Sequence, residues 1–350
     1  MTLTPSLNQD LQALVNQLSS HKHGKWIERA LAVLLRISEE EIDRLDWKII
    51  ATSLEDLEHG FGTFYQYRHI RKVTIFGSAR ISAETQEYRL AVEFARRITE
   101  LGFMILTGGG GGIMQAGNEG AGRDQSFGLN INLPFEQEAN PYIINDPKLI
   151  NFKYFFTRKL FFLRESDAIA LFPGGFGTQD EAFETLTLCQ TGKYGPVPLV
   201  LVDEPGGNYW ELWDKYIRNL IARGLISPED TNLYSITDNI GEACQMIANF
   251  YSVYHSSRYV NDLLVMRLNT ELSDEQIELL NQQFNDILVK GRIEKSEALP
   301  PEKGHETQDL PRIVLYFNQK DLGRLYQMIK EINQWGEESK ENLHLHPERK

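Results

Sequence analysis

The chain has 350 residues, 41% hydrophobic and 24% charged, enough for one large globular domain with additions or for two domains. Its net charge of −13 excludes a broad basic face, so we expect no general binding to nucleic acid and none to an anionic membrane. Two cysteines, no signal-peptide pattern at the start and no apolar run long enough to span a bilayer together predict a cytoplasmic protein.

Residues 1–68 have the pattern of a helical layer. Apolar side chains recur at helical spacing, first at Leu11, Leu14, Val15 and Leu18 and again through 27–35. Residues 38–41 have the form of a capping box and predict a further helix that runs toward Trp47. We expect this layer to cover the following domain or to form a dimer surface.

Residues 69–257 alternate between strands and helices. We predict strands at 72–76, 103–106, 127–133, 168–172, 197–202 and 233–237. Helices are predicted at 84–101, 113–121, 152–165, 181–189, 209–223 and 238–254, with Gly102 ending the first of them. This alternation is typical of an α/β fold with a doubly wound parallel sheet, in which the loops after the strands meet at one edge.

The pattern restarts at 258–335 as a small α/β domain, whose role is either regulation or packing. Strands are predicted at 263–268, 289–296 and 312–317, and helices at 273–288 and 319–335. The first helix starts with a capping box at 273–276. We expect a mobile loop at 298–309 and a disordered, charged tail at 336–350.

Three glycine turns follow three of the predicted strands, at 77–79, 108–112 and 174–178. Since they share one sheet edge, they predict a site for a ligand of nucleotide size, with 108–112 and 174–178 as its phosphate cradle. Pro173 cannot extend the sheet, and the Thr178 hydroxyl can donate to an oxyanion. A P-loop is excluded because no G-x-x-x-x-G-K-[ST] spacing occurs, and a dinucleotide fingerprint fits badly.

Charged residues flank the last of these turns. Asp180 and Glu181 lie at the predicted helix start, where we expect one to serve chemistry, and capping is the favoured role of Asp180. Arg158 and Lys159 stand between aromatic residues on the preceding helix. They are either a surface pair whose stems cover an apolar seam, or a grip on phosphate or ribose in which Lys159 backs Arg158 or forms an ion pair.

These motifs together resemble the LOG (Lonely Guy) family, whose members are often mislabelled lysine decarboxylases. The resemblance spans about 70–225 and rests on residues 108–114, residues 128–134, the Arg158–Lys159 pair and the P-G-G-x-G-T-x-x-E motif at 173–181. It implies a Rossmann-like fold, a homodimer or higher homo-oligomer, and Arg158 and Glu181 as catalytic residues. Gln179 departs from the leucine or methionine usual there, which we expect to alter packing only. The residues expected to bind substrate or phosphate are Gly77, Ser78, Thr107, Gly108, Gly109, Gly110, Gly111, Gly112, Lys159, Pro173, Gly174, Gly175, Gly177 and Thr178.

The implied activity is hydrolysis of a nucleoside 5'-monophosphate, of purine or cytokinin type, to free base and ribose 5-phosphate. A fixed carboxylate suits this chemistry because breaking the N-glycosidic bond builds positive charge at C1'. No metal-ligand spacing occurs and no lysine stands out as a Schiff-base former, so we expect neither a metal nor a cofactor. The alternative is a non-catalytic nucleotide sensor or cofactor carrier on the same fold, which the extra C-terminal domain favours.

Overall fold

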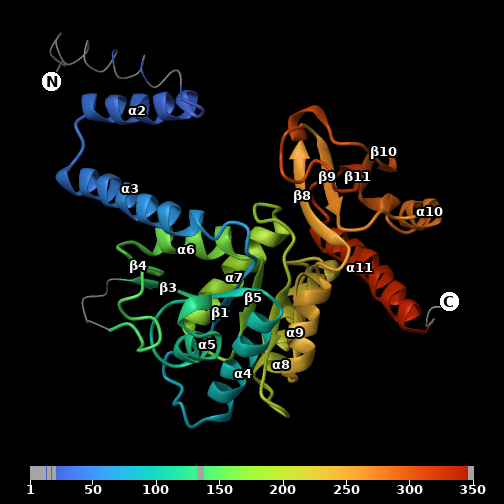
Figure 1. Ribbon diagram of the computed structural model, residues 1–350, viewed down its shortest axis with the longest axis horizontal. Coiled ribbons are helices and arrows are strands. Elements are labelled where there is room, and N and C mark those ends of the chain that lie inside the picture. The colour runs from blue at the N-terminus through green and yellow to red at the C-terminus, as the bar shows by residue number, and fades with distance from the viewer. Residues whose placement is uncertain (1–12, 14–16, 18–20, 132–137, 346–350) are drawn as a thin grey trace, which may run out of the picture. The chain divides into compact units, whose positions relative to one another are not determined.

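The protein is described here by a computed structural model that covers residue 13, residue 17, residues 21–131 and residues 138–345 (Figure 1). The chain divides into two compact units, residues 1–58 and residues 59–350. The helix expected around Leu11 and Leu18 falls mostly outside the described residues, as does the strand end expected at Pro134. No helix within the described ranges is both long and apolar enough to cross a membrane.

The first unit contains α2 (Gly24–Glu39) and the start of α3 (Arg44–Tyr65). The capping box predicted at 38–41 is wrong. Ser38 lies in the last turn of α2, where its hydroxyl donates to the Leu35 carbonyl at 2.7 Å. At the start of α3 it is instead the Asp46 carboxylate that accepts from the backbone N–H of Asp43, at 3.3 Å.

The second unit is built on a parallel sheet of seven strands in the order β4-β3-β2-β1-β5-β6-β7. The strands are β1 (Lys72–Phe76), β2 (Met104–Thr107), β3 (Ser126–Ile131), β4 (Leu149–Phe152), β5 (Ala168–Leu171), β6 (Leu199–Val202) and β7 (Ser235–Thr237). In the register of the central strands, Val73 of β1 pairs with Ile105 of β2 and with Ala168 of β5. The predicted doubly wound α/β fold is confirmed, and β4 is an edge strand that the sequence pattern missed.

Helices cover both faces of this sheet. Alternation along the strands sends Phe172 onto Phe94 of α4 and Phe76 onto Phe162 of α6. One face is covered by α4 (Gln86–Glu100), α5 (Ile113–Ala121) and α9 (Ile240–Asn249). The other is covered by α6 (Phe155–Glu165), α7 (Phe176–Gln190) and α8 (Tyr209–Ala222). Short 3-10 helices are η1 (Arg123–Gln125), η2 (Pro228–Leu233), η3 (Asn285–Ile287) and η4 (Pro300–Glu302).

A second, antiparallel sheet follows in the order β10-β11-β9-β8. Its strands and helices are β8 (Tyr254–Val260), β9 (Leu263–Leu268), α10 (Asp274–Gln283), β10 (Leu288–Lys295), β11 (Arg312–Phe317) and α11 (Leu322–Leu345). The capping box at Ser273 and Gln276 is confirmed at the start of α10. Strand β8 was missed, and α11 runs past the end predicted at Trp335.

The small antiparallel sheet shares a hydrophobic core with the end of the parallel one. Tyr326 of α11 is buried there, and its hydroxyl accepts from the Val197 N–H at 3.0 Å and lies 3.3 Å from Cys189 Sγ of α7. Residues 59–350 form one compact unit, so this division of the chain does not separate a domain at 258–335. The predicted domain boundaries stay predictions.

The loop expected to be mobile at 298–309 is anchored instead. The Glu302 side chain is fully buried, and its carboxylate accepts from Arg267 at 2.7 Å and from Arg312 at 2.8 Å. Two guanidinium groups satisfy the charge of this carboxylate, which explains how it tolerates burial. Sequence pattern alone did not indicate this anchor, because its three members belong to separate segments.

Candidate active site

The three glycine turns meet at the centre of the parallel sheet. The chain places β2, β3 and β4 on one side of β1 and then crosses to β5 on its other side, which makes the gap between β1 and β5 a topological switch point. The Ser78 N–H donates to the Pro173 carbonyl at 3.1 Å, and the Ile113 N–H donates to the Ser78 carbonyl at 3.0 Å. The predicted convergence of the turns at one sheet edge is therefore confirmed.

A cavity of about 790 Å³ opens at this switch point. Segments that follow β1 and β5 line it together with α6. The lining residues are Phe76, Gly77, Ser78, Ala79, Arg80, Met114, Phe155, Arg158, Gly174, Gly175, Phe176, Gly177, Thr178, Gln179, Asp180 and Glu181. Nine of the sequence-predicted site residues are thus brought to one cavity: Gly77, Ser78, Arg158, Gly174, Gly175, Gly177, Thr178 and Glu181 line it directly, with Pro173 held against Ser78 just behind.

Helix α7 begins at the cavity wall. Its N-cap is Gly175, and Phe176, Gly177 and Thr178 form a first turn that contains no acidic residue. The unpaired N–H groups of such a turn and the helix dipole favour an anion. The helix starts five residues earlier than predicted, so the capping role expected for Asp180 is wrong and Glu181 lies in the second turn.

Gly174 is required by the packing of this turn. A Cβ at this position would lie 2.1 Å from Thr178 Oγ1 and 2.9 Å from Ser78 N, whereas one at Gly175 would meet no atom within 4 Å. The turn is braced from α8, because the Tyr209 hydroxyl donates to the Gly174 carbonyl at 2.5 Å and accepts from Gln179 Nε2 at 2.7 Å. Gln179 therefore supports the turn as well as lining the cavity.

Glu181 is a buried carboxylate in the cavity wall. Its side chain is 6% exposed, and Oε2 has no hydrogen-bond partner. Burial raises the pKa of Glu181 to about 7, against the opposing effect of the Lys159 and Arg158 charges. A carboxyl group with a pKa near neutrality can exist in either protonation state under ordinary conditions, as acid–base chemistry requires.

Arg158 faces the same cavity from α6. Its guanidinium packs over the rings of Phe155 and Phe162, 5.4 and 5.3 Å from their centroids, and its buried Nε has no partner. Burial lowers the pKa of Arg158, and Glu181 acts in the opposite direction. Of the two interpretations from sequence, the geometry favours a guanidinium directed into the site over a solvent-facing pair.

Lys159 lies behind Glu181 and does not line the cavity. Its Nζ forms ion pairs with Asp180 at 2.7 Å and with Glu184 at 2.5 Å, and lies 3.8 Å from Glu181 Oε1. Burial alone would lower the pKa of Lys159, but its hydrogen bonds to Asp180 and Glu184 raise it. Of the alternatives given for this residue, the structure supports the ion pair.

The 108–112 glycine run does not line the cavity, although the sequence predicted it as half of the phosphate cradle. Thr107 Oγ1 accepts from the Gly109 N–H at 3.0 Å, and Asn140 Nδ2 donates to the carbonyls of Gly109 and Gly110 at 3.1 and 3.0 Å. Gly112 has φ +62°, and a Cβ there would lie 2.2 Å from the Ser78 carbonyl oxygen. The run is therefore a packed support beneath the 77–79 turn.

Sequence reasoning missed several cavity residues. Phe155 and Phe176 offer rings at the rim that are 53% and 96% exposed, while Met114 and the exposed Arg80 add an apolar and a cationic group. The position of Phe176 between two glycines of the 174–178 turn, where no packed core is expected, was a usable signal in the sequence. Among the described residues, no group of three or more His, Cys, Asp or Glu side chains is placed to hold a metal ion.

Fold and cavity define a class of protein: a Rossmann-like α/β protein with a helix N-terminus, a buried arginine and a buried glutamate at its switch point. Residues 110–247 match the family model described as "Possible lysine decarboxylase". The predicted resemblance to the LOG family is confirmed over this part of the chain.

The curated relatives are named as cytokinin riboside 5'-monophosphate phosphoribohydrolases. A probable cytokinin riboside 5'-monophosphate phosphoribohydrolase of Oryza sativa subsp. japonica is 25% identical over 177 residues, covering 49% of this chain and 74% of that protein. The cytokinin riboside 5'-monophosphate phosphoribohydrolase of Mycobacterium tuberculosis is 29% identical over 113 residues, covering 32% of this chain and 55% of its own length. That of Arabidopsis thaliana is 25% identical over 173 residues, covering 48% and 77%.

Solved structures give similar coverage at lower identity. The molybdenum cofactor binding protein from Rippkaea orientalis is 19% identical with a TM-score of 0.37, covering 51% of this chain and 94% of that one. The molybdenum cofactor carrier protein from Chlamydomonas reinhardtii is 19% identical with a TM-score of 0.34, covering 51% and 99%.

Proposed function

We propose that this protein hydrolyses the N-glycosidic bond of nucleoside 5'-monophosphates of purine or cytokinin type, giving free base and ribose 5-phosphate. One observation carries the proposal. Arg158 Nε and Glu181 Oε2 are both buried without a partner in the walls of one cavity, which also includes the first turn of α7. Buried polar atoms without partners are costly, and a phosphorylated sugar offers the groups that would satisfy them.

The substrate phosphate binds the first turn of α7, where backbone N–H groups and the Thr178 hydroxyl donate to its oxygens. Arg158 holds the phosphoribosyl part as a planar fork and so fixes the reacting carbon relative to Glu181. In the bound substrate, the base points from the sugar toward the rim of the cavity. There it stacks on the exposed rings of Phe155 and Phe176.

Ionised Glu181 acts at C1'. As the bond from C1' to the base nitrogen breaks, positive charge develops on the sugar, and the carboxylate stabilises it. Water adds its hydroxyl group to C1' and gives its remaining proton to the Glu181 carboxylate, which passes this proton on to the nitrogen of the departing base and is thereby regenerated. Relatives named as phosphoribohydrolases support this assignment of the reaction.

The test is incubation of the purified protein with adenosine 5'-monophosphate and with its N6-isopentenyl derivative, followed by chromatography for free base and an enzymatic assay for ribose 5-phosphate. We expect both products in equal amounts. Glu181→Gln should reduce turnover about a hundredfold or more while keeping nucleotide affinity within a fewfold, because it removes the charge and retains the shape.

Glu211→Gln is the matched control, since this glutamate is exposed on α8 and forms a salt bridge with Lys215. It should leave turnover unchanged. Tight binding of both nucleotides without release of base would overturn the proposal and establish the non-catalytic nucleotide sensor in its place.

A further inference from the structure

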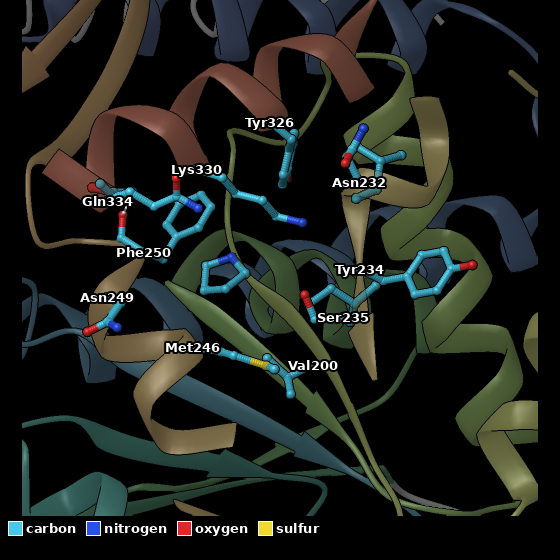
Figure 2. Close-up of a pocket in the computed structure, with 14 residues that line it drawn as sticks. Val200, Asn232, Tyr234, Ser235, Met246, Asn249, Phe250, Tyr326, Lys330 and Gln334 are labelled. Atoms are coloured by element: carbon cyan, nitrogen blue, oxygen red, sulfur yellow. Dashed lines mark hydrogen bonds between the residues drawn. The ribbon is translucent and has the colours of Figure 1, made fainter. Parts of the chain in front are cut away.

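A second cavity, of about 330 Å³, lies where strands of the parallel sheet begin, whereas the candidate active site lies where they end. Figure 2 shows the residues that line this second cavity. It is bounded by the beginnings of β6 and β7, by α9 and by α11, and it shares no lining residue with the first cavity. Val200 and Met246 lie on one side of it, and Tyr326 and Lys330 of α11 lie on the other (Figure 2). Its volume falls at the lower end of the range for small-molecule sites.

Lys330 is the charged residue of this cavity. Its side chain extends from α11 into the space between the walls (Figure 2), and no acid lines the cavity with it. Burial lowers the pKa of Lys330, and no carboxylate offsets that effect. Within the described ranges, its Nζ has neither a hydrogen bond nor an ion pair.

Other buried lysines of this unit are satisfied. Lys72 Nζ donates to the carbonyls of Tyr67 and Ile70, both at 2.8 Å, and Lys148 pairs with Asp146 at 2.8 Å. Lys330 is only partly buried, so its ammonium group keeps access to solvent and loses part of its hydration without gaining such a partner. Lys330 therefore differs from the structural lysines and is placed to pair with an anion from outside the chain.

The remaining lining fits a ligand with an apolar body. Val200, Met246 and Phe250 supply apolar surface, and the side chains of Ser235 and Asn249 add hydrogen-bonding groups at the wall. Asn333 is already committed, since its carboxamide accepts from the N–H groups of Val253 and Tyr254 and donates to the Phe250 carbonyl. The available groups thus comprise one cation, a few neutral polar atoms and an apolar floor.

We propose that this cavity is a binding site for a small anion with an apolar body, whose carboxylate or phosphate group pairs with Lys330 while its body packs on Val200, Met246 and Phe250. The site is separate from the nucleotide cavity, so the proposal does not depend on the proposed hydrolase activity.

Titration calorimetry on the full chain tests it, with benzoate and phenyl phosphate as probes and benzyl alcohol as the uncharged probe of the same body. We expect wild-type protein to bind at least one anion and to bind benzyl alcohol more weakly. Lys330→Met should lower anion affinity roughly tenfold or more, the effect of one charge-assisted contact, and leave benzyl alcohol unaffected. Tighter binding of benzoate would indicate a carboxylate ligand, and tighter binding of phenyl phosphate would indicate a phosphate ligand.

Lys320→Met is the matched control, because Lys320 is exposed just before α11, and it should bind like wild type. Methionine-methyl NMR locates the probes: the Met246 signal should shift on titration, while that of Met114 in the other cavity stays fixed. Absence of anion binding by wild type, equal binding by Lys330→Met, or a shift at Met114 without one at Met246 would each overturn the proposal.

Discussion

At the scale of single residues, the ionised form of Glu181 is needed for the proposed chemistry but lowers the stability of the fold. Its carboxyl group has a pKa of about 7 in the folded chain against an ordinary value of 4.5, chiefly because it is buried. The folded state therefore holds this proton when the unfolded chain has released it. The resulting contribution to stability is fully present below about pH 4.5 and is lost as the pH rises through 7.

This predicts the stability of Glu181→Gln. Glutamine stays neutral, so above pH 7 the variant avoids burying a charge and should unfold with a free energy higher by up to about 3 kcal/mol. At pH 4 the two proteins should be nearly equal. Chemical denaturation at pH 4 and pH 8 measures the difference, and a gain that does not change with pH would contradict the prediction. Glu211→Gln should show no such gain.

Lys159 is predicted to set the protonation of Glu181 without contacting substrate. Its charge lowers the pKa of that carboxyl, so Lys159→Met should raise it further and move the acidic limb of the kcat/KM profile to higher pH. Lys159→Arg keeps the charge and should keep the limb close to its original position. A merely structural role would lower kcat in Lys159→Met without moving the limb. A carbon-13 NMR titration of Glu181 gives the same shift independently of activity.

The placement of Arg158 and Glu181 at one cavity could be predicted because a short, specific motif contains each of them, while their catalytic roles stay predictions. An ion pair of Lys159 was one predicted alternative, but its partners Asp180 and Glu184 could not be named. They are more than twenty residues away in the chain and become neighbours only through the packing of α6 on α7. The unpaired Lys330 was hidden for the same reason: its isolation is a property of the packed walls around it.

At the scale of elements, two neighbouring glycines of the 174–178 turn, Gly174 and Gly175, have different surroundings although they look equivalent in the sequence. Gly174→Ala should destabilise the protein by about 1–3 kcal/mol, because its Cβ would overlap Thr178 and approach the Ser78 N–H. Gly175→Ala is the matched variant, with open space around the new methyl group and a negative φ of −84°, and should change stability by less than about 0.5 kcal/mol. Denaturant midpoints measure both, and equal losses would contradict the packing argument.

The elements missed from sequence share a physical cause. Strand β4 is four residues long at a sheet edge, and β8 has the polar sequence His-Ser-Ser-Arg at its centre, so neither shows a sustained apolar pattern. The start of α7 was placed too late because Phe-Gly-Thr-Gln has low helix propensity. Tertiary contacts, including those of Tyr209, stabilise this turn in spite of its sequence.

At the scale of the whole molecule, the two sheets should unfold together. They share a buried cluster in which Cys189, Val197 and Leu233 from the parallel-sheet region pack with Leu315, Tyr326 and Ile329 from the C-terminal part. Amide hydrogen exchange should therefore give the same opening free energy for Ile169 in β5 and Leu315 in β11, because both need global unfolding. A value for Leu315 lower by more than about 2 kcal/mol would show that the C-terminal part opens independently.

Homo-oligomerisation and a cytoplasmic location stay predictions of the sequence. The first is measured by light scattering coupled to size-exclusion chromatography at several protein concentrations. The measurement should use the full chain, because its first unit has an exposed apolar face that includes Trp26 and Leu54, which are 62% and 48% exposed.

The buried polar atoms without partners affect how the protein would evolve under selection for thermal stability. In the described chain, three buried side-chain atoms lack a hydrogen-bond partner, and two of them belong to Arg158 and Glu181. A population selected for heat resistance alone would therefore gain most readily by substitution at these two positions, and would lose the site first. Both residues lower the stability of the fold, and the chemistry proposed for the cavity explains why the chain carries them.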